Sequence, residues 1–282
     1  MRLYKTKKDL TVLLKNSKAN NIEIGFVPTM GALHNGHISL VTKAKNELGL
    51  VVCSIFVNPT QFNDPKDFAK YPVTINEDIY LLEKVGCDVL FLPSVDEMYP
   101  DGLKTDVNFE LGFLETILDG KFRPGHFQGV CQVMDRLLSI VLPNKLFMGQ
   151  KDFQQCMVLK KMTASNFPEL QLIVCPTERA FDGLAMSSRN VRLSIEERQR
   201  AIKIFTTLQF LKTNVKPGDV SGLKLIATNN LAEDGFKVDY VEIANAQTLQ
   251  LLDNWDGNEP LVFLIAAFLN EVRLIDNMLP DK

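Results

Sequence analysis

Two histidines stand close together in the segment PTMGALHNGH at residues 28–37, although the whole chain contains only three. An apolar run at residues 22–27 precedes the segment, and a helical pattern follows it. A helix that begins near Gly36 or His37 would offer unpaired amide groups and a partial positive charge to an anion. Gly31 and Gly36 would let a ligand approach the backbone, and the imidazoles of His34 and His37 could donate to phosphate oxygens. The segment therefore predicts a phosphate site.

Two other interpretations of this histidine pair stay open at the level of sequence. The rings could cap the helix, or lie half-buried, without touching a ligand. Together with His126 they could also hold zinc, but no carboxylate or cysteine stands at a spacing that would complete such a site. The lysine–serine pair of a Walker loop is missing from the segment, so a bound phosphate would be handled differently. The glycines and the strand-to-helix context favour the phosphate site.

Two cationic residues follow other predicted elements. Lys151 comes shortly after the apolar run 145–148, so its ammonium would lie at the carboxyl-end crevice where doubly wound sheets bind ligands. A solvated surface lysine is the alternative. Arg189 follows two serines in the polar segment 177–190, and there a plain interdomain linker is the alternative.

The elements that must position these residues alternate between short apolar runs and amphipathic segments up to about residue 175. The expected strands are residues 22–27, 50–57, 89–92, 145–148 and 172–175. Several are continuously apolar, as parallel strands covered on both faces are. Apolar stripes at helical spacing lie between them, for example over residues 37–48 and 127–141. The alternation predicts an α/β fold with a doubly wound, Rossmann-like parallel sheet.

The pattern changes after Pro176. The polar segment 177–190 predicts a loop, and Ser194 with Glu197 three residues later predicts the capped start of a long helix that runs to about Lys212. Strand-like runs follow at residues 238–243, 261–269 and 272–276. We therefore expect two domains: residues 1–176, which bind the ligands, and residues 177–282, a smaller α+β lid domain.

Composition narrows the class of protein. Of the 282 residues, 46% are hydrophobic and 23% charged, and the net charge of −3 leaves no broad basic field for nucleic acid. The five cysteines are odd in number and widely spaced, which favours free thiols in a reducing cytoplasm. The longest apolar run, residues 261–269, is far shorter than the roughly 20 residues of a membrane helix, and the N-terminus lacks the apolar core of a signal peptide. We expect a cytoplasmic protein without a membrane partner.

The segment at residues 28–37 resembles the signature of the pantothenate synthetase (pantoate–β-alanine ligase) family, within the HIGH-type nucleotidyltransferase superfamily. Four further blocks match that family in order: FVNPTQF at 56–62, RPGHF at 123–127, GQKDFQQ at 149–155 and DGLAMSSRN at 182–190. The resemblance implies that pantoate and ATP, accompanied by Mg²⁺, give pantoyl-adenylate and pyrophosphate. The amine of β-alanine would then attack the adenylate to give pantothenate and AMP. The resemblance also implies a homodimer.

The same resemblance implies roles for individual residues. His34, His37, Lys151 and Arg189 would be catalytic, because positioning and cationic donors must stabilise the charge that grows on the leaving pyrophosphate. The expected ATP-binding residues are Met30, Gly31, Ala32, Leu33, His34, Asn35, Gly36, His37, Gly149, Gln150, Lys151, Asp152, Glu178, Met186, Ser187, Ser188 and Arg189. No protein ligand to a metal is expected among them.

The substrate acids would be held by neutral side chains. The resemblance implies that Gln61 and Gln155 bind pantoate, since amides donate and accept without adding charge beside the triphosphate. Met30 would line the same site, and Phe62 would supply an apolar wall for the geminal methyl groups of pantoate. Asn58 would serve substrate or magnesium, with a simple Asn-Pro turn as the alternative.

Some features limit the resemblance. Many family members carry glutamate where this chain has Gln150, and valine more often where it has Glu178. His126 could bind a ligand or only cap a helix. Two other functions stay open: another HIGH-type nucleotidyltransferase that transfers a nucleotide to a small acid or phosphate ester, and a nucleotide-binding regulatory module without chemistry.

Overall fold

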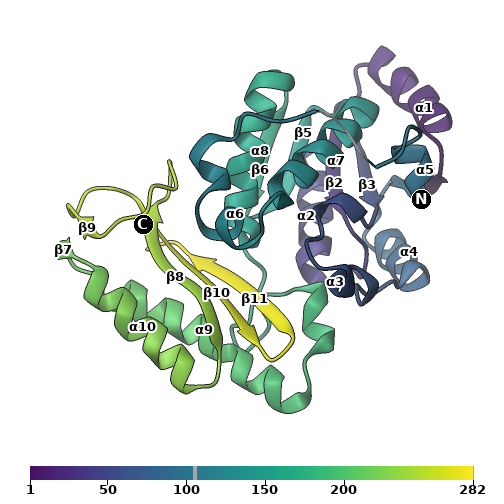
Figure 1. Ribbon diagram of the computed structural model, residues 1–282. Coiled ribbons are helices and arrows are strands. Elements are labelled where there is room, and N and C mark those ends of the chain that lie inside the picture. Colours follow the sequence, from purple (N-terminus) through teal and green to yellow (C-terminus); the bar gives the residue numbers. More distant parts are fainter. Residues whose placement is uncertain (104–106, 282) are drawn as a thin grey trace. The chain divides into compact units, whose positions relative to one another are not determined.

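The computed structural model describes residues 1–103 and 107–281, which form two compact units (Figure 1). The N-terminal unit consists of residues 1–149 and 158–176, and the C-terminal unit of residues 150–157 and 177 onward. The chain thus changes unit after residue 176. The segment 150–157, which the sequence analysis placed with residues 1–176, lies in the C-terminal unit.

The N-terminal unit is built on a parallel sheet. Its strands in the described residues are β1 (Arg2–Tyr4), β2 (Ile24–Thr29), β3 (Leu50–Ile55), β4 (Val89–Phe91), β5 (Lys145–Gly149) and β6 (Gln171–Cys175). Their order is β1-β4-β3-β2-β5-β6, and every neighbouring pair is parallel. From β2 the chain continues to β3 and β4 on one side of the sheet, and β5 and β6 then lie on the other side of β2. The topological switch point is therefore between β2 and β5. The predicted doubly wound α/β sheet is confirmed.

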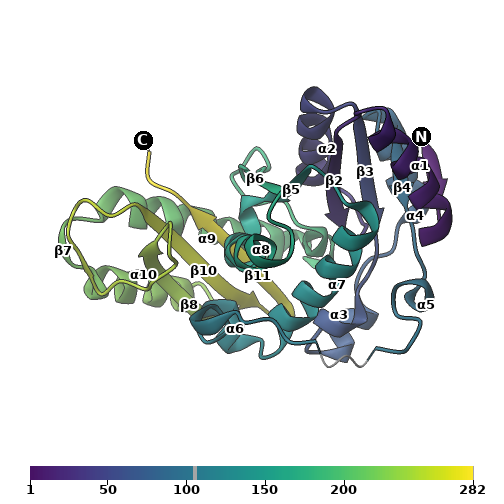
Figure 2. The same ribbon diagram turned by 90° about the horizontal axis from the view of Figure 1, so that it is seen from above.

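Helices cover both faces of this sheet. The helices of this unit are α1 (Lys7–Ala19), α2 (Asn35–Glu47), α3 (Pro65–Ala69), α4 (Ile75–Lys84), α5 (Val95–Met98), α6 (Leu118–Phe122), α7 (His126–Val141) and, beginning in the C-terminal unit, α8 (Phe153–Asn166). Right-handed crossovers put α2 and α4 on one face and α1 and α7 on the other, and strands β2 and β3 lie between α2 and α7 in Figure 2. Val41, Ala44 and Leu82 pack with Val27 and Phe147 in one buried core.

The C-terminal unit is an antiparallel sheet covered by two helices. The strands β8 (Lys237–Asn245), β10 (Leu261–Leu269) and β11 (Val272–Met278) lie in the order β11-β10-β8, and β7 (Gly218–Asp219) pairs with β9 (Asn254–Trp255). Helices α9 (Ile195–Asn214) and α10 (Ser221–Glu233) share a core with the sheet, which includes Ile204, Leu231, Phe263 and Ile265. This is the α+β arrangement that the sequence predicts.

Helix α9 begins with the capping box that the sequence predicts. Ser194 Oγ accepts the N–H of Glu197 at 3.2 Å, and Glu197 Oε2 accepts the N–H of Ser194 at 2.7 Å. Several elements were not predicted, among them helix α10, which buries only Ala227 and Leu231, and strand β1, which is three largely exposed residues. Within the described ranges, no helix is long and apolar enough to cross a membrane.

Candidate active site

The histidine-containing segment forms the turn between β2 and α2. Gly31 and Ala32 both adopt left-handed backbone conformations, with φ of 81° and 48°, and this is uncommon for alanine. A buried carboxylate holds the turn: Asp78 Oδ2 accepts the N–H of Ala32 at 3.0 Å, and Oδ1 accepts that of Leu33 at 2.8 Å. Thr74 Oγ1 donates to the same carboxylate at 3.1 Å. A side chain of α4 therefore fixes the conformation that presents the histidines.

The sequence analysis did not find Asp78. Its signal in the sequence is an acidic residue on the buried face of an amphipathic helix, one turn before Leu82. An acid at such a position needs a partner. The sequence does not reveal that the partners are backbone N–H groups 45 and 46 residues away.

Both histidines cap helix α2. His34 is the N-cap residue, and its Nδ1 accepts the N–H of Gly36 at 3.1 Å. His37 Nδ1 accepts the N–H of His34 at 3.3 Å, and the two ring centroids are 4.1 Å apart. Because Nδ1 is an acceptor in each ring, the neutral imidazole carries its proton on Nε2. The capping interpretation is therefore correct for Nδ1, and it gives both rings the tautomer that donates from Nε2.

Asn58 organises the turn after β3. It is 1% exposed and caps the short 3-10 helix η1 (Pro59–Gln61). Its Oδ1 accepts from Tyr99 Oη at 2.7 Å and from Thr60 Oγ1 at 3.1 Å. Its Nδ2 donates to the carbonyl oxygen of Gly129 at 3.1 Å and to Gln61 Oε1 at 3.3 Å. The amide of Asn58 is thus used on other protein groups, among them the side chain of Gln61.

The structure brings Gln61 and Met30 together. Gln61 Nε2 donates to Met30 Sδ at 3.0 Å, so the amide is held between Met30 and Asn58. Phe62, the next residue, is half-buried, and its ring centroid lies 5.2 Å from that of Phe68 and 5.8 Å from that of Tyr71. These residues lie at or just after the ends of β2, η1 and α3, and they form a mixed polar and aromatic cluster in the N-terminal unit.

Helix α7 supports η1 from the other side. A Cβ at Gly129 would lie 2.5 Å from the carbonyl oxygen of Thr60, so only glycine permits this approach. His126, the first residue of α7, is 6% exposed, and its Nδ1 lies 2.8 Å from the carbonyl oxygen of Gln61. Its Nε2 lies 3.0 Å from Arg123 Nη1. The N-cap residue of α7 is Gly125, without a side-chain cap, so the His126 ring contacts the backbone of Gln61 instead of capping its own helix.

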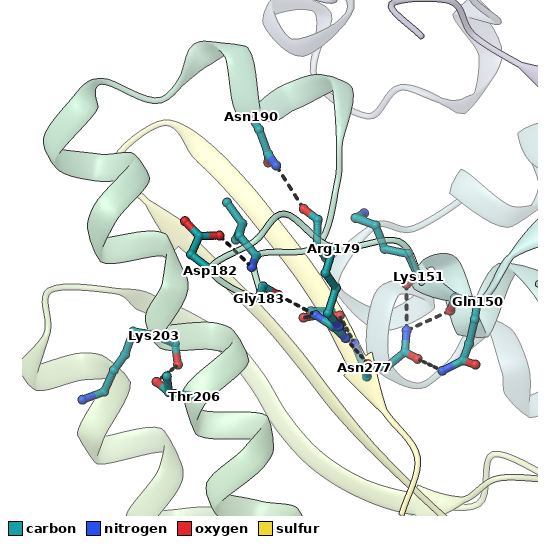
Figure 3. A network of polar contacts seen from close by, with 12 residues as sticks. Gln150, Lys151, Arg179, Asp182, Gly183, Asn190, Lys203, Thr206 and Asn277 are labelled. Atoms are coloured by element: carbon teal, nitrogen blue, oxygen red, sulfur yellow. Dashed lines mark hydrogen bonds and ion pairs between the residues drawn. The ribbon is translucent and has the colours of Figure 1, made fainter. Parts of the chain in front are cut away.

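In the C-terminal unit, Gln150, Lys151 and Asp152 form the 3-10 helix η3 (Gln150–Asp152) immediately after Gly149, where β5 ends. The side chain of Lys151 is 18% exposed, and its Nζ lies 3.7 Å from Asp152 Oδ1. The ammonium extends away from Asn277, which contacts the backbone of the turn (Figure 3). Gln155 follows, half-buried, in the first turn of α8.

The segment expected to be a loop is a short hairpin. Arg179 and Ala185 form a β-bridge, and the N–H of Met186 donates to the carbonyl oxygen of Glu178 at 2.9 Å. The side chain of Glu178 is exposed, so the glutamate at this position disturbs no packing. Asp182 Oδ1 accepts a hydrogen bond from Arg198 Nη2 at 3.0 Å, which ties the hairpin to α9, and the Arg198 guanidinium lowers the pKa of Asp182.

The hairpin leads into the 3-10 helix η4 (Ser188–Arg192). Ser187 Oγ caps it by accepting the N–H of Arg189 at 3.3 Å, and Ser188 is buried. Asn190 Nδ2 donates to the carbonyl oxygen of Ala185 at 3.0 Å, which closes the turn back onto the hairpin (Figure 3). Arg189 thus stands on a hydrogen-bonded turn, not on an unstructured linker.

The expected site residues fall into both units. Met30 to His37, Asn58, Gln61 and Phe62 belong to the N-terminal unit, as does Gly149. Gln150, Lys151, Asp152, Gln155, Glu178 and Met186 to Arg189 belong to the C-terminal unit. Among the described residues no group of three or more His, Cys, Asp and Glu side chains is placed to hold a metal ion.

Comparisons with known proteins agree over almost the whole chain. The family model described as pantoate-beta-alanine ligase matches residues 2–279. The pantothenate synthetase of Bacteroides fragilis is 45% identical over 279 residues, which cover 99% of this chain and 98% of that protein. The corresponding protein of Bacteroides thetaiotaomicron is 43% identical, with the same coverage.

Two solved structures have the same fold. The pantothenate synthetase of Thermus thermophilus superimposes with a TM-score of 0.89 at 38% identity, covering 99% of both chains. The pantoate-beta-alanine ligase of Francisella tularensis, complexed with beta-gamma ATP and beta-alanine, gives a TM-score of 0.82 at 41% identity and covers 99% of this chain and 97% of that one.

Proposed function

The chain belongs to the pantoate–β-alanine ligase family, and from this premise we propose how its residues carry out the reaction. It is an ATP-dependent ligase that condenses pantoate with β-alanine through pantoyl-adenylate and releases pyrophosphate and AMP. In the first step a carboxylate oxygen of pantoate bonds to the α-phosphorus while the bond from that phosphorus to the pyrophosphate oxygen breaks. In the second step the β-alanine nitrogen bonds to the acyl carbon and AMP leaves.

The observation that carries the proposal is the capping of α2 by two Nδ1 atoms. It fixes His34 and His37 as Nε2 donors at the positive end of a helix. Such donors bind ATP phosphate oxygens and stabilise the charge that grows on the leaving group without first having to reorient. We also assign ATP binding to the turn residues from Met30 to Gly36.

The C-terminal unit carries cationic residues of its own. We assign phosphate contacts to Lys151 and Arg189, supported by Gln150, Asp152, Ser187 and Ser188. Gly149, Glu178 and Met186 contribute backbone or apolar contacts to the nucleotide. The Francisella tularensis relative, whose structure is a complex with beta-gamma ATP and beta-alanine, supports a nucleotide site in a chain of similar sequence. The hairpin and η4 serve as the lid that keeps water from the adenylate.

Pantoate binds at the cluster around Gln61. The Gln61 amide, held by Asn58 and Met30, is pre-oriented to donate to and accept from the hydroxyl and carboxylate groups of pantoate. Phe62 offers an apolar wall to the geminal methyl groups, and Gln155 supplies a second amide. Asn58 acts through Gln61 in this proposal, because its own amide is occupied by protein partners.

Magnesium accompanies ATP in this proposal. Mg²⁺ is commonly bound through substrate phosphates, water and few protein oxygens. We also propose a homodimer in the cytoplasm. The five free cysteines fit a reducing compartment, and light scattering on the purified protein measures the oligomeric state.

Isotope exchange tests the reaction and separates it from the alternatives. Exchange between ATP and labelled pyrophosphate should require pantoate, and AMP should appear only when β-alanine is added. A nucleotidyltransferase that stops after the first transfer would leave β-alanine without effect. A regulatory module would show no exchange at all.

Conservative variants separate the chemical role of the histidines from their capping role. Serine is a strong N-cap residue and glutamate is common at N3, so His34→Ser and His37→Glu retain the caps and remove the ring Nε2 donors. We expect the melting temperature to stay near that of the wild type while exchange falls by a factor on the order of 10² or more. Wild-type exchange in both variants would overturn the proposed role. The matched alanine variants should lose stability as well.

A further inference from the structure

The end of strand β11 contacts two segments that lie far from it in the sequence, both within the C-terminal unit (Figure 3). One is the turn that carries Lys151. The other is the hairpin that leads to Arg189. Asp276 and Asn277 make these contacts and are 4% and 1% exposed. The family blocks in the sequence do not include either residue.

The Asn277 side chain clamps the Lys151 turn. Its Nδ2 donates to the carbonyl oxygens of Gln150 and Lys151, both at 2.9 Å, and its Oδ1 accepts from Gln150 Nε2 at 3.0 Å. Carbonyl oxygens only accept, so these contacts fix the orientation of the amide. A glutamate carboxylate in place of the Gln150 amide would place an acceptor next to Asn277 Oδ1, which is also an acceptor. The glutamine of this chain therefore suits a hydrogen bond to Asn277.

The backbone of Asn277 is held as firmly as its side chain. Its N–H donates to Asp276 Oδ1 at 2.7 Å, and its carbonyl oxygen accepts from Arg179 Nη2 at 3.1 Å. Strand β11 is at the edge of its sheet, where unpaired backbone groups would otherwise face outward. The contacts from Asp276 and Arg179 satisfy these groups and fix the clamp itself.

The same arginine holds the hairpin. Arg179 forms a two-point ion pair with Asp276, with nitrogen–oxygen distances of 2.6 and 3.0 Å. Its Nη1 also donates to the carbonyl oxygen of Gly183 at 3.0 Å, and its guanidinium lies 4.9 Å from the centre of the Phe205 ring. Burial raises the pKa of Asp276, and the Arg179 guanidinium opposes that rise. A planar arginine is suited to such a bidentate contact.

We propose that Asn277 is a positioning residue for Lys151 and that Asp276, through Arg179, holds the hairpin to the same point. A lysine ammonium sits on a flexible stem, so its position in the transition state depends on a fixed backbone. The end of β11 sets the backbone of both cationic segments of the site. This inference rests on the proposed role of Lys151 in binding ATP phosphates.

A double-mutant cycle tests the inference with Asn277→Asp, Lys151→Ala and the two together. Asn277→Asp preserves shape but removes both N–H donors and places a carboxylate against two carbonyl oxygens. We expect it to lower kcat by about tenfold to a hundredfold, as small misplacements of catalytic groups do. It should have little further effect once Lys151 is alanine, because it acts through that residue.

The control is Asn229→Asp, which adds the same charge to an exposed position of α10 and should leave kcat unchanged. A merely structural role for Asn277 would lower kcat equally with and without Lys151, and that result would overturn the inference. Wild-type kcat in Asn277→Asp, with Lys151→Ala inactive, would overturn it as well. Full activity of Lys151→Ala would instead refute the proposed role of Lys151. If Asn277→Asp does not fold, Asn277→Ala is carried through the same cycle.

Discussion

The Nδ1 atom of His126 lies 2.8 Å from the carbonyl oxygen of Gln61. On the other side of the ring, Nε2 lies 3.0 Å from Arg123 Nη1. A guanidinium only donates, so Nε2 accepts and Nδ1 carries the proton that it donates to Gln61. His126 is therefore a neutral, buried ring that fixes the backbone of the residue to which we assign pantoate.

Replacing His126 should affect pantoate more than ATP. His126→Leu leaves the Gln61 carbonyl without its donor, and the loss of such a contact costs about 1–3 kcal/mol. We expect kcat/KM for pantoate to fall about tenfold or more, with a small change in KM for ATP. His126→Asn retains a donor near the position of Nδ1 and should recover part of the loss. Equal kinetics in the leucine variant and the wild type would contradict this role.

Asp78 should be essential to the histidine turn. Asp78→Asn keeps the shape but cannot accept with both terminal atoms from the N–H groups of Ala32 and Leu33. Losing a buried bond to a charged acceptor should lower the free energy of unfolding by about 1.5–3 kcal/mol, which denaturant titration measures. Pantoate-dependent exchange should fall with it, since Ala32 is held in a left-handed conformation.

Thr74→Val is the matched control for that change. It removes one neutral hydrogen bond to the same carboxylate and leaves both backbone contacts in place. Its effect on stability should stay near about 1 kcal/mol, with nearly normal exchange. If Asp78→Asn and Thr74→Val lowered the free energy of unfolding by the same small amount, the Asp78 carboxylate would not be the group that holds the turn.

The thiols should be inert in the folded protein. All five cysteines are free and buried, and burial raises the pKa of Cys87 to about 11 and that of Cys131 to about 12. Because the thiolate is the reactive form, a disulfide reagent at about pH 8 should label none of the five rapidly until the chain unfolds. A thiol that reacts at once in the native protein would contradict this.

The same shifts predict the direction of a pH effect. The folded-state pKa values of Cys87 and Cys131 lie above that of an exposed thiol, about 8.5, so the folded chain binds more protons above that pH. Their contribution to stability is fully present below the unfolded pKa and is lost as the pH rises through the folded values. Thermal unfolding measured at increasing alkaline pH checks the sign.

The sequence by itself determined the class of fold, the chemistry and the local caps. Short apolar runs alternate with amphipathic helical segments along the chain. This pattern depends only on residues close together in the sequence, so the parallel sheet could be predicted from it. The Ser194–Glu197 capping box spans three residues and was visible in the same way. The blocks at residues 28–37 and 149–155 pointed to the family. The residue types and spacings within such a block can be read from the sequence without the tertiary structure.

The tertiary structure alone decided which residues hold the site in place. Leu33 and Asp78 are 45 residues apart, Gln61 and His126 are 65 apart, and Lys151 and Asn277 are 126 apart. The residues on either side of a buried polar side chain do not indicate a partner that is so distant in the sequence. The two residues come together only when whole helices and strands pack. For the same reason the segment 150–157 joined the C-terminal unit: its carbonyl groups find their donor on the last strand of the chain.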